Sequence, residues 1–267
     1  MPHALIIRTA GTNCDEELQY AFELAGASTE LIHLDRLTDD PGIFERFDLL
    51  GIPGGFSYGD DLGAGKIFAL LMANHLYPAF RRLIDRGVPI FAPCNGFQVL
   101  VKMGLLPGPL DHTAWPTERP PAQCVTLTHN AGGRFIDAWT RVEIDEHSPC
   151  VWTAGLEVDA DLAVLPIAHG EGRFVTDDAT LESIERAGLV CLRYAEGDNP
   201  NGSMNRIAGL CDRSGLIFGL MPHPERFTRW EHHPAWTRLD ESTRTRTPLG
   251  LRMFENAVRH AESMVTT

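Results

Sequence analysis

The cysteine at position 94 stands in the strongest context for nucleophilic chemistry in this sequence. It lies in Ala92-Pro93-Cys94-Asn95-Gly96, between a short apolar run and a helical pattern. That is the context of a nucleophile elbow, a sharp strand-to-helix turn that presents a reactive side chain. The free N–H groups of a helix N-terminus favour a thiolate over a thiol. Two observations point the other way: most cysteines in apolar surroundings are core filler, and Ala92 stands where an elbow usually has glycine.

A histidine and a glutamate follow another apolar run late in the chain. Pro224 separates His223 from Glu225, and a residue before proline favours extended backbone. In an extended chain, side chains two positions apart point the same way, about 6.5 Å from each other. The carboxylate can then hold one imidazole nitrogen and leave the other free, which is how a triad orients its base. Taken alone, His-Pro-Glu is more often an ordinary surface turn.

A pair of glycines, Gly54 and Gly55, ends a third apolar run in the segment Pro53-Gly54-Gly55-Phe56. Glycines after a buried strand allow backbone N–H groups to approach a ligand closely. Such groups could stabilise an oxyanion, although a flexible turn would have the same composition.

Several other chemistries are excluded by spacing. Residues 59–66 resemble a phosphate loop, but the spacing is one residue too long, and Ile67 stands where serine or threonine would bind magnesium. His169-Gly170-Glu171 and His223-Pro224-Glu225 match the H-x-E of zinc deaminases, yet no P-C-x-x-C follows either of them. No metal site is predicted.

Composition narrows the class of protein and its partners. The chain has 267 residues and a formal charge of −13, which disfavours a nucleic-acid or anionic-membrane surface. No stretch approaches the roughly 20 apolar residues of a membrane span, and the N-terminus lacks the pattern of a signal peptide. The six cysteines are scattered without a C-x-x-C pair, so we expect reduced thiols and a cytoplasmic location.

Elements that could position these side chains alternate between strand and helix in the first half of the chain. Strands are predicted over residues 4–7, 30–34, 47–52, 88–91 and 216–220, and helices from residue 15 and over residues 67–86, 96–103 and 251–264. Residues 127–175 are more β-like, and residues 227–248 fit no pattern. The order predicts an α/β fold with a single doubly wound, mostly parallel sheet flanked by helices. Ligands bind such sheets at the carboxyl ends of strands, which is where the three segments lie.

Seven segments, in chain order, resemble the class I (triad-type) glutamine amidotransferases, and in particular the glutaminase components of phosphoribosylformylglycinamidine synthases. The matching segments are residues 11–16 (GTNCDE), 53–60 (PGGFSYGD), 94–98 (CNGFQ), 130–135 (NAGGRF), 166–172 (PIAHGEG), 199–203 (NPNGS) and 221–226 (MPHPER). The resemblance implies a flavodoxin-like fold and one type-1 amidotransferase domain over residues 1–267. Residues 228–267 form a longer tail, in which residues 247–257 resemble the C-terminal end of the large single-chain synthases.

The resemblance also implies a reaction and its residues. Cys94, His223 and Glu225 would hydrolyse glutamine, and the ammonia would pass to a synthetase subunit that makes formylglycinamidine ribonucleotide in purine synthesis. No cofactor is expected on this chain; ATP and Mg²⁺ belong to the synthetase, which acts with or without a small accessory subunit. The residues expected to hold the oxyanion or the substrate are Gly54, Gly55, Phe56, Asn95, Gln98, Asn130 and Arg134. His169 and Glu171 are assigned to the site rim or to the partner interface.

Two departures and three alternatives accompany this interpretation. Ala92-Pro93 replaces the usual glycine and aliphatic residue, and Gly63 stands where an arginine is expected. The alternatives are a triad glutaminase that serves another synthetase, a cysteine peptidase-like hydrolase and a non-catalytic binding module. The spacing of 129 positions from Cys94 to His223 permits a peptidase, but the papain-type segment around the cysteine is absent.

Overall fold

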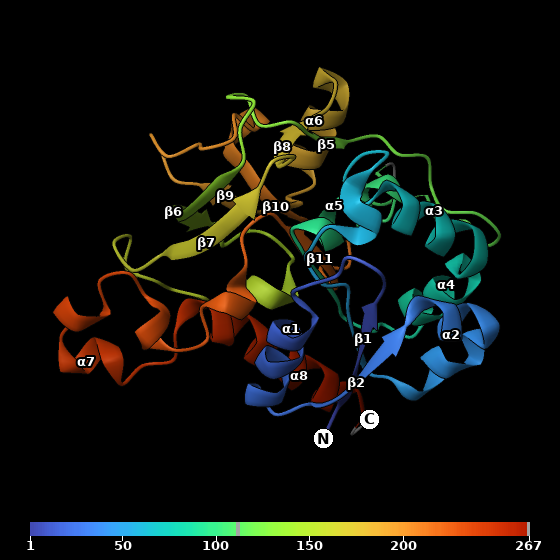
Figure 1. Ribbon diagram of the computed structural model, residues 1–267, viewed down its shortest axis with the longest axis horizontal. Helices are drawn as coiled ribbons and strands as arrows, with labels where there is room; N and C mark the ends of the chain where they lie inside the picture. Colours follow the sequence, from blue (N-terminus) through green and yellow to red (C-terminus); the bar gives the residue numbers. More distant parts are fainter. Residues whose placement is uncertain (111–112, 266–267) are drawn as a thin grey trace.

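A nine-stranded sheet forms the centre of the protein (Figure 1). The structure is a computed structural model that describes residues 1–110 and 113–265. Its strand order is β2-β1-β3-β4-β11-β10-β9-β6-β7. In that order the strands span Ser28–His33, His3–Arg8, Leu49–Gly51, Ile90–Pro93, Ile217–Leu220, Ile207–Cys211, Val190–Tyr194, Ile136–Ile144 and Val164–His169. A separate two-stranded sheet pairs β5 (Thr126–Thr128) with β8 (Arg173–Val175).

The direction of the strands confirms the predicted, mostly parallel sheet. β2, β1, β3, β4 and β11 pair in parallel, whereas each pairing from β11 through β10, β9 and β6 to β7 is antiparallel. Only β10 and β6 therefore run against the other seven strands of this sheet. The inner parallel strands β3, β4 and β11 are short and fully buried because both faces of the sheet are covered there.

Helices cover both faces, as a doubly wound sheet requires. Alternate residues of β1 belong to two different hydrophobic cores, one on each face of the sheet. Leu5 and Ile7 pack under one helical layer, and Ala4 and Ile6 pack under the other. The first layer contains α2 (Leu34–Asp39), α3 (Lys66–His75), α4 (Tyr77–Asp85) and α5 (Asn95–Lys102). The second contains α1 (Asp15–Leu24) and α8 (Leu249–Val265), which lie side by side in Figure 1.

The helix predicted over residues 67–86 is wrong in one respect, because the structure has two helices there. α3 ends at His75, and α4 begins at Tyr77 with Pro78 in its first turn. Proline has no backbone N–H to continue the preceding helix, but it fits the first turn of a new one.

The segment that fits no sequence pattern consists of short turns. Between residues 227 and 248 lie two single-turn 3₁₀ helices, Trp230–His232 and Trp236–Arg238, and the four-residue helix α7 (Glu241–Arg244). The Trp230 indole donates to the Arg246 carbonyl at 2.6 Å, which ties the two ends of the segment together. Sequence analysis also missed β9, β10 and α6 (Asp178–Arg186). Within the described residues, no helix has the length and hydropathy needed to cross a membrane.

Candidate active site

The candidate residues converge because four neighbouring strands deliver them to one edge of the sheet. β1, β3, β4 and β11 are adjacent and parallel, so their carboxyl ends lie together. The segments that follow them carry, in strand order, Cys14, Gly54 and Gly55, Cys94, and His223. Residues far apart in the sequence thereby become neighbours at the edge where doubly wound folds bind ligands.

Cys94 occupies a strained turn between β4 and α5. Its φ of 49° and ψ of −106° lie outside the regions that L-residues normally adopt. Its backbone N–H donates to the Leu220 carbonyl at 2.7 Å, which fixes the turn to the end of β11. A side chain at Gly96 would clash with the Ile52 carbonyl oxygen, so glycine is required for the close approach of α5 to β3. This is the geometry of a nucleophile elbow, with Ala92 fully buried beneath it.

His223 and Glu225 form a buried pair. Imidazole Nδ1 lies 2.6 Å from Glu225 Oε1, and the two residues are only 1% and 3% exposed. Since an ionised carboxylate can only accept, Nδ1–H is the donor and Nε2 faces away from the carboxylate. The predicted extended conformation is wrong: Pro224–Arg226 forms a single 3₁₀ turn. Proline presets the backbone of the first position of such a turn, and the turn brings the two side chains into direct contact.

Gly54 is the point at which the thiol and the imidazole meet. A β-carbon built on Gly54 would lie 2.9 Å from His223 Cε1 and 3.5 Å from Cys94 Cβ. The Cys94 thiol itself donates weakly to the Ala168 carbonyl, at 3.6 Å. The structure thus places Cys94, His223 and Glu225 together in a buried site.

Neighbouring groups shift the pKa of His223 in a direction suited to proton transfer. Burial lowers it, but the negative charge of Glu225, and that of Cys94 when it is a thiolate, outweigh burial and hold it well above its usual value. His223 Nε2 and Glu225 Oε2 are buried without a conventional hydrogen-bond partner among the described residues. An imidazole in this setting can accept a thiol proton and remain charged.

Gly55 and Phe56 continue the loop beyond Gly54. Gly55 has a φ of 140° and forms an isolated bridge with Thr12, where a β-carbon would press on the backbone of residues 11–13. Phe56 is 44% exposed, and its ring lies 6.2 Å from that of Phe135. The Phe56 N–H donates to the Gly11 carbonyl at 2.9 Å, so the loop is fixed to residues 11–13 and carries an exposed aromatic side chain beyond the two glycines.

Asn95 and Gln98 form a hydrogen-bonded chain along the first turn of α5. Asn95 accepts from the Ser57 N–H at 3.3 Å and donates to Gln98 Oε1 at 2.9 Å. Gln98 in turn donates to the Glu171 carbonyl at 2.6 Å. The chain links the Phe56 loop to the segment after β7, which lines the same edge.

Asn130 and Arg134 occupy different environments. Asn130 is buried, donates to the carbonyls of His169 and Arg134, and accepts from the Gly172 N–H and His169 Nδ1. Arg134 is exposed. Burial, together with the positive charge of His223, lowers the pKa of His169 to about 4, so its ring is neutral at pH 7. Substrate contacts by Gln98, Asn130 and Arg134 stay predictions.

One residue at this edge was missed by the functional assignment from sequence. Cys14, at the start of α1, is 1% exposed, and its sulphur would lie 3.2 Å from a β-carbon on Gly54. Arg226 Nη2 donates to this sulphur at 3.0 Å. The only signal in the sequence was the position of Cys14 within the segment of residues 11–16, which gave it no role.

Two groups of described side chains have donor atoms close enough to hold a metal ion. Cys150, Cys191 and Cys211 bring three thiols within 4.8 Å of one another in the apolar core. Cys14, His223 and Glu225 form the second group, but there the carboxylate is already bonded to the imidazole.

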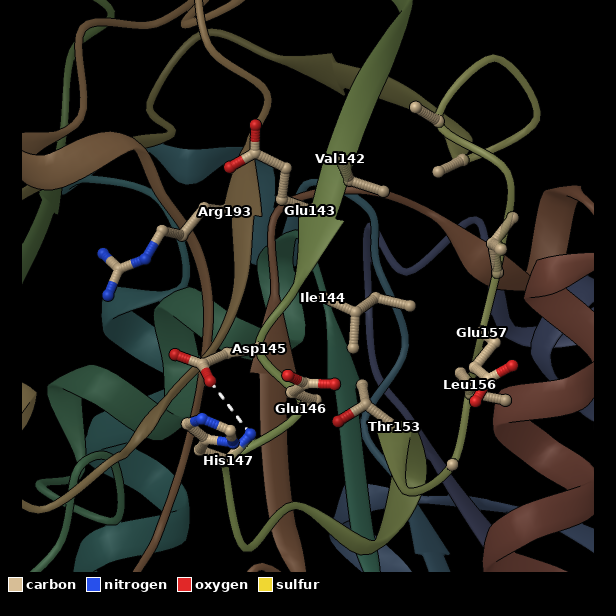
Figure 2. Close-up of a pocket in the computed structure, with 14 residues that line it drawn as sticks. Val142, Glu143, Ile144, Asp145, Glu146, His147, Thr153, Leu156, Glu157 and Arg193 are labelled. Atoms are coloured by element: carbon tan, nitrogen blue, oxygen red, sulfur yellow. Dashed lines mark hydrogen bonds between the residues drawn. The ribbon is translucent and has the colours of Figure 1, made fainter.

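A cavity of about 710 Å³ lies away from the candidate residues (Figure 2). It opens between the end of β6 and the segment after Thr153, and its lining includes Glu143, Glu146 and Glu157. Cys94, His223 and Glu225 are not among its described lining residues. The cavity therefore adds nothing to the chemistry of the triad.

Comparison with known proteins identifies the family. The family model of the CobB/CobQ-like glutamine amidotransferase domain matches residues 1–261. Phosphoribosylformylglycinamidine synthase subunit PurQ of Dehalococcoides mccartyi is 40% identical, over 97% of this chain and 98% of that protein. The same subunit of Treponema denticola is 38% identical with the same coverage.

Solved structures agree with this relationship. A chain in the structure of PurLQS from Thermotoga maritima superimposes with a TM-score of 0.70 at 30% identity, over 97% of this chain and 98% of that one. A glutamine amidotransferase from the same organism, at 15% identity and a TM-score of 0.52, supports the fold alone. The chain therefore belongs to the CobB/CobQ-like glutamine amidotransferases and, within them, to the PurQ family of phosphoribosylformylglycinamidine synthase subunits.

Proposed function

We propose that this chain is the glutaminase subunit of a phosphoribosylformylglycinamidine synthase. It hydrolyses glutamine to glutamate and ammonia, and a synthetase subunit uses the ammonia with ATP to convert formylglycinamide ribonucleotide to formylglycinamidine ribonucleotide. The observation that carries the proposal is the buried group of Cys94, His223 and Glu225 beside Gly54. The names of the PurQ relatives indicate which synthase this subunit would belong to.

The reaction begins with the Cys94 sulphur attacking the side-chain amide carbon of glutamine. His223 takes the thiol proton at Nε2 and later gives it to the departing nitrogen, so that the C–N bond breaks and ammonia leaves. Glu225 keeps Nδ1 protonated and stabilises the imidazolium through their 2.6 Å contact. Water then attacks the γ-glutamyl thioester, releases glutamate and restores the thiol.

The oxyanion of each tetrahedral intermediate needs donors that are already in place. Backbone N–H groups near Gly55 and Asn95 lie on the two segments that flank Cys94, the loop after β3 and the first turn of α5. Removing one such donor typically costs about 3–4 kcal/mol of transition-state stabilisation. Gly54, Phe56, Gln98, Asn130 and Arg134 complete the proposed oxyanion and substrate set.

The proposed partner is a synthetase subunit, with or without a small accessory subunit, because a similar chain occurs in PurLQS. ATP and Mg²⁺ would bind to the synthetase, and no cofactor is proposed for this chain. We further propose a cytoplasmic location and one domain over residues 1–267. Contacts of α8 with α1 and with the 3₁₀ helix Val151–Thr153 support including the tail in that domain.

The test uses the complex of this chain with its synthetase. Cys94→Ala is expected to abolish glutamine-dependent product formation while leaving ammonia-dependent formation intact, because only the glutaminase half loses its nucleophile. Cys124→Ser, a change at a half-buried thiol outside the triad, is the matched control and should support both activities. Continued use of glutamine by the Cys94→Ala complex would overturn the proposal.

A further inference from the structure

Three buried thiols meet at a point that the proposed reaction does not use. Cys191 lies in β9, Cys211 ends the neighbouring strand β10, and Cys150 directly precedes the 3₁₀ helix Val151–Thr153. Each of the three is 0% exposed, and their sulphur atoms all lie within 4.8 Å of one another. They are far apart in the sequence, so only the fold brings them together.

Hydrogen bonds between the segments hold the backbone around these thiols. β9 and β10 pair as antiparallel strands, which brings Cys191 next to Cys211. The Asp145 N–H donates to the Cys191 carbonyl at 3.2 Å, and the Thr153 N–H donates to the Cys150 carbonyl at 3.3 Å. The three side chains therefore extend from ordered backbone, which is what a metal site needs to hold its ligands in place.

The spacing of the sulphur atoms suits an ion that prefers thiolate ligands. Zn²⁺ binds thiolates at about 2.3 Å in a tetrahedral arrangement, so the sulphur atoms around it lie about 3.8 Å apart. Sulphur atoms that are already within 4.8 Å of one another reach this spacing by small side-chain rotations. Three thiolates with a neutral fourth ligand also carry the same charge as the Cys₃His sites that hold structural zinc.

Ser148 borders the thiols on the side where a fourth ligand would lie. Its hydroxyl is 3.5 Å from Cys211 Sγ and accepts from the Cys150 N–H at 3.4 Å. In a tetrahedral zinc site, a ligand oxygen and a ligand sulphur lie about 3.6 Å apart. Ser148 is half-buried, so the thiols are one side chain below the surface. Its hydroxyl, or a water molecule bound to it, is therefore in position to complete the coordination.

The cavity in Figure 2 lies against the segments that carry the thiols. Asp145 and Thr153, which donate to the carbonyls of two of the three cysteines, line it. Its lining includes four carboxylates, those of Glu143, Asp145, Glu146 and Glu157. Arg193 is the only lysine or arginine among its described lining residues, and it is paired with Glu185 at 2.6 Å. A cavity lined in this way concentrates cations beside the thiols.

We propose that Cys150, Cys191 and Cys211 bind one Zn²⁺ ion as a structural centre in the antiparallel half of the sheet. Each thiol releases its proton to solvent as its bond to the ion forms, so three protons leave for each ion bound. The ion joins β9, β10 and the segment before Val151, and it takes no part in the proposed reaction. The inference goes beyond the glutaminase function and does not depend on it.

The test measures the metal content of the purified full-length chain. The chain is stripped with a chelator under reducing conditions, supplied with Zn²⁺ and dialysed. We expect one zinc ion per chain in the wild type and none in Cys150→Ala, Cys191→Ala or Cys211→Ala, because each variant lacks one ligand. Cys124→Ala is the matched control, since that half-buried thiol lies outside the cluster, and it should keep the ion.

A further control addresses the other group of donor atoms, which contains Cys14, His223 and Glu225. Cys14→Ala removes the only sulphur of that group and should keep the zinc. If zinc is lost from Cys14→Ala but kept in all three cluster variants, the ion binds at the other group and the proposed site is refuted.

A second readout needs no substitution, so the proposal stays testable if a cluster variant does not fold. Thermal unfolding identifies the folded variants. Co²⁺ in place of Zn²⁺ in the wild type should give the thiolate-to-cobalt charge-transfer absorption of a tetrahedral sulphur site. A wild-type chain that retains no zinc and shows no such absorption has no metal centre, and the three thiols then only fill the core. No glutamine is present in either measurement, so the result is independent of the glutaminase test.

Discussion

Replacing Glu225 by glutamine removes one charge from the proposed catalytic site and changes its shape very little. The carboxylate lies 2.6 Å from His223 Nδ1, and both side chains are buried. The amide cannot balance the charge that His223 acquires from Cys94. Its NH₂ group can also face Nδ1 and stabilise the tautomer with the proton on Nε2, which is unable to accept the thiol proton.

The size of the effect follows from the burial of the pair. Breaking a buried ion pair by removing one partner costs about 3–5 kcal/mol, since the remaining charge is left without compensation. The raised pKa of His223 favours the charged ring in the resting site, and the charge persists in the transition state, so the cost falls on both stability and the reaction. We expect kcat to fall by about 10²–10⁴, at 1.36 kcal/mol for each factor of ten. Glutamate release by the synthetase complex is the assay, and exposed Glu157→Gln is the matched control.

The same substitution has a consequence for stability that depends on pH. The pKa of His223 is raised in the folded protein, so folding favours its protonated form. This stabilisation is complete below the unfolded pKa of about 6.5 and is lost as pH rises through the higher folded value. In Glu225→Gln the pKa of His223 should fall, and the loss of stability between those two values should become smaller. Urea unfolding at a series of pH values measures this loss of stability in the wild type and in the variant.

Two results would refute this reasoning. A Glu225→Gln complex that releases glutamate within about threefold of the wild type would mean that the pair has no role in proton transfer. Parallel stability curves for the wild type and the variant would mean that Glu225 does not hold the charge of His223.

Two further substitutions test how the site is built. Gly96→Ala should lower the melting temperature and the reactivity of Cys94 towards iodoacetamide, because the new methyl group meets the Ile52 carbonyl. Gly132→Ala is the control, since its methyl group meets nothing within 4 Å, and it should leave both the melting temperature and the reactivity unchanged. Asn130→Ala should cost about 1–3 kcal/mol in urea unfolding, because the His169 ring and the Gly172 N–H lose their shared acceptor. A raised KM with unchanged stability would contradict this structural role and favour the predicted substrate contact.

The parts of the fold that could be predicted from the sequence are those determined by the local pattern of apolar and turn-forming residues. Apolar runs bounded by glycine and proline located the parallel strands, and the residues after them, such as Cys94 and His223, fell at the predicted edge. The Pro224 turn was predicted incorrectly, because the rule that extended chain precedes proline was applied to the residues after it. The same residue presets the turn that brings Glu225 onto the imidazole.

The parts that could not be predicted depend on contacts between distant segments. Cys14 has no informative neighbours in the sequence, and its contact with Arg226 joins residues 212 positions apart. The strands β9 and β10 were missed because they lie between irregular segments beyond residues 127–175, the region predicted to be β-like. Their place in the sheet is set by pairing, which single-sequence patterns do not specify.

The order of the strands also constrains when this protein becomes able to release ammonia. β11 is the last strand of the sheet in the chain, yet it lies beside β4 near the middle of the sheet order, and His223, the proposed base, follows it. A growing polypeptide on the ribosome has the proposed nucleophile, Cys94, long before His223 exists. On the proposed mechanism, incomplete or prematurely terminated chains are therefore inert, and glutamine is spared until synthesis has passed Glu225.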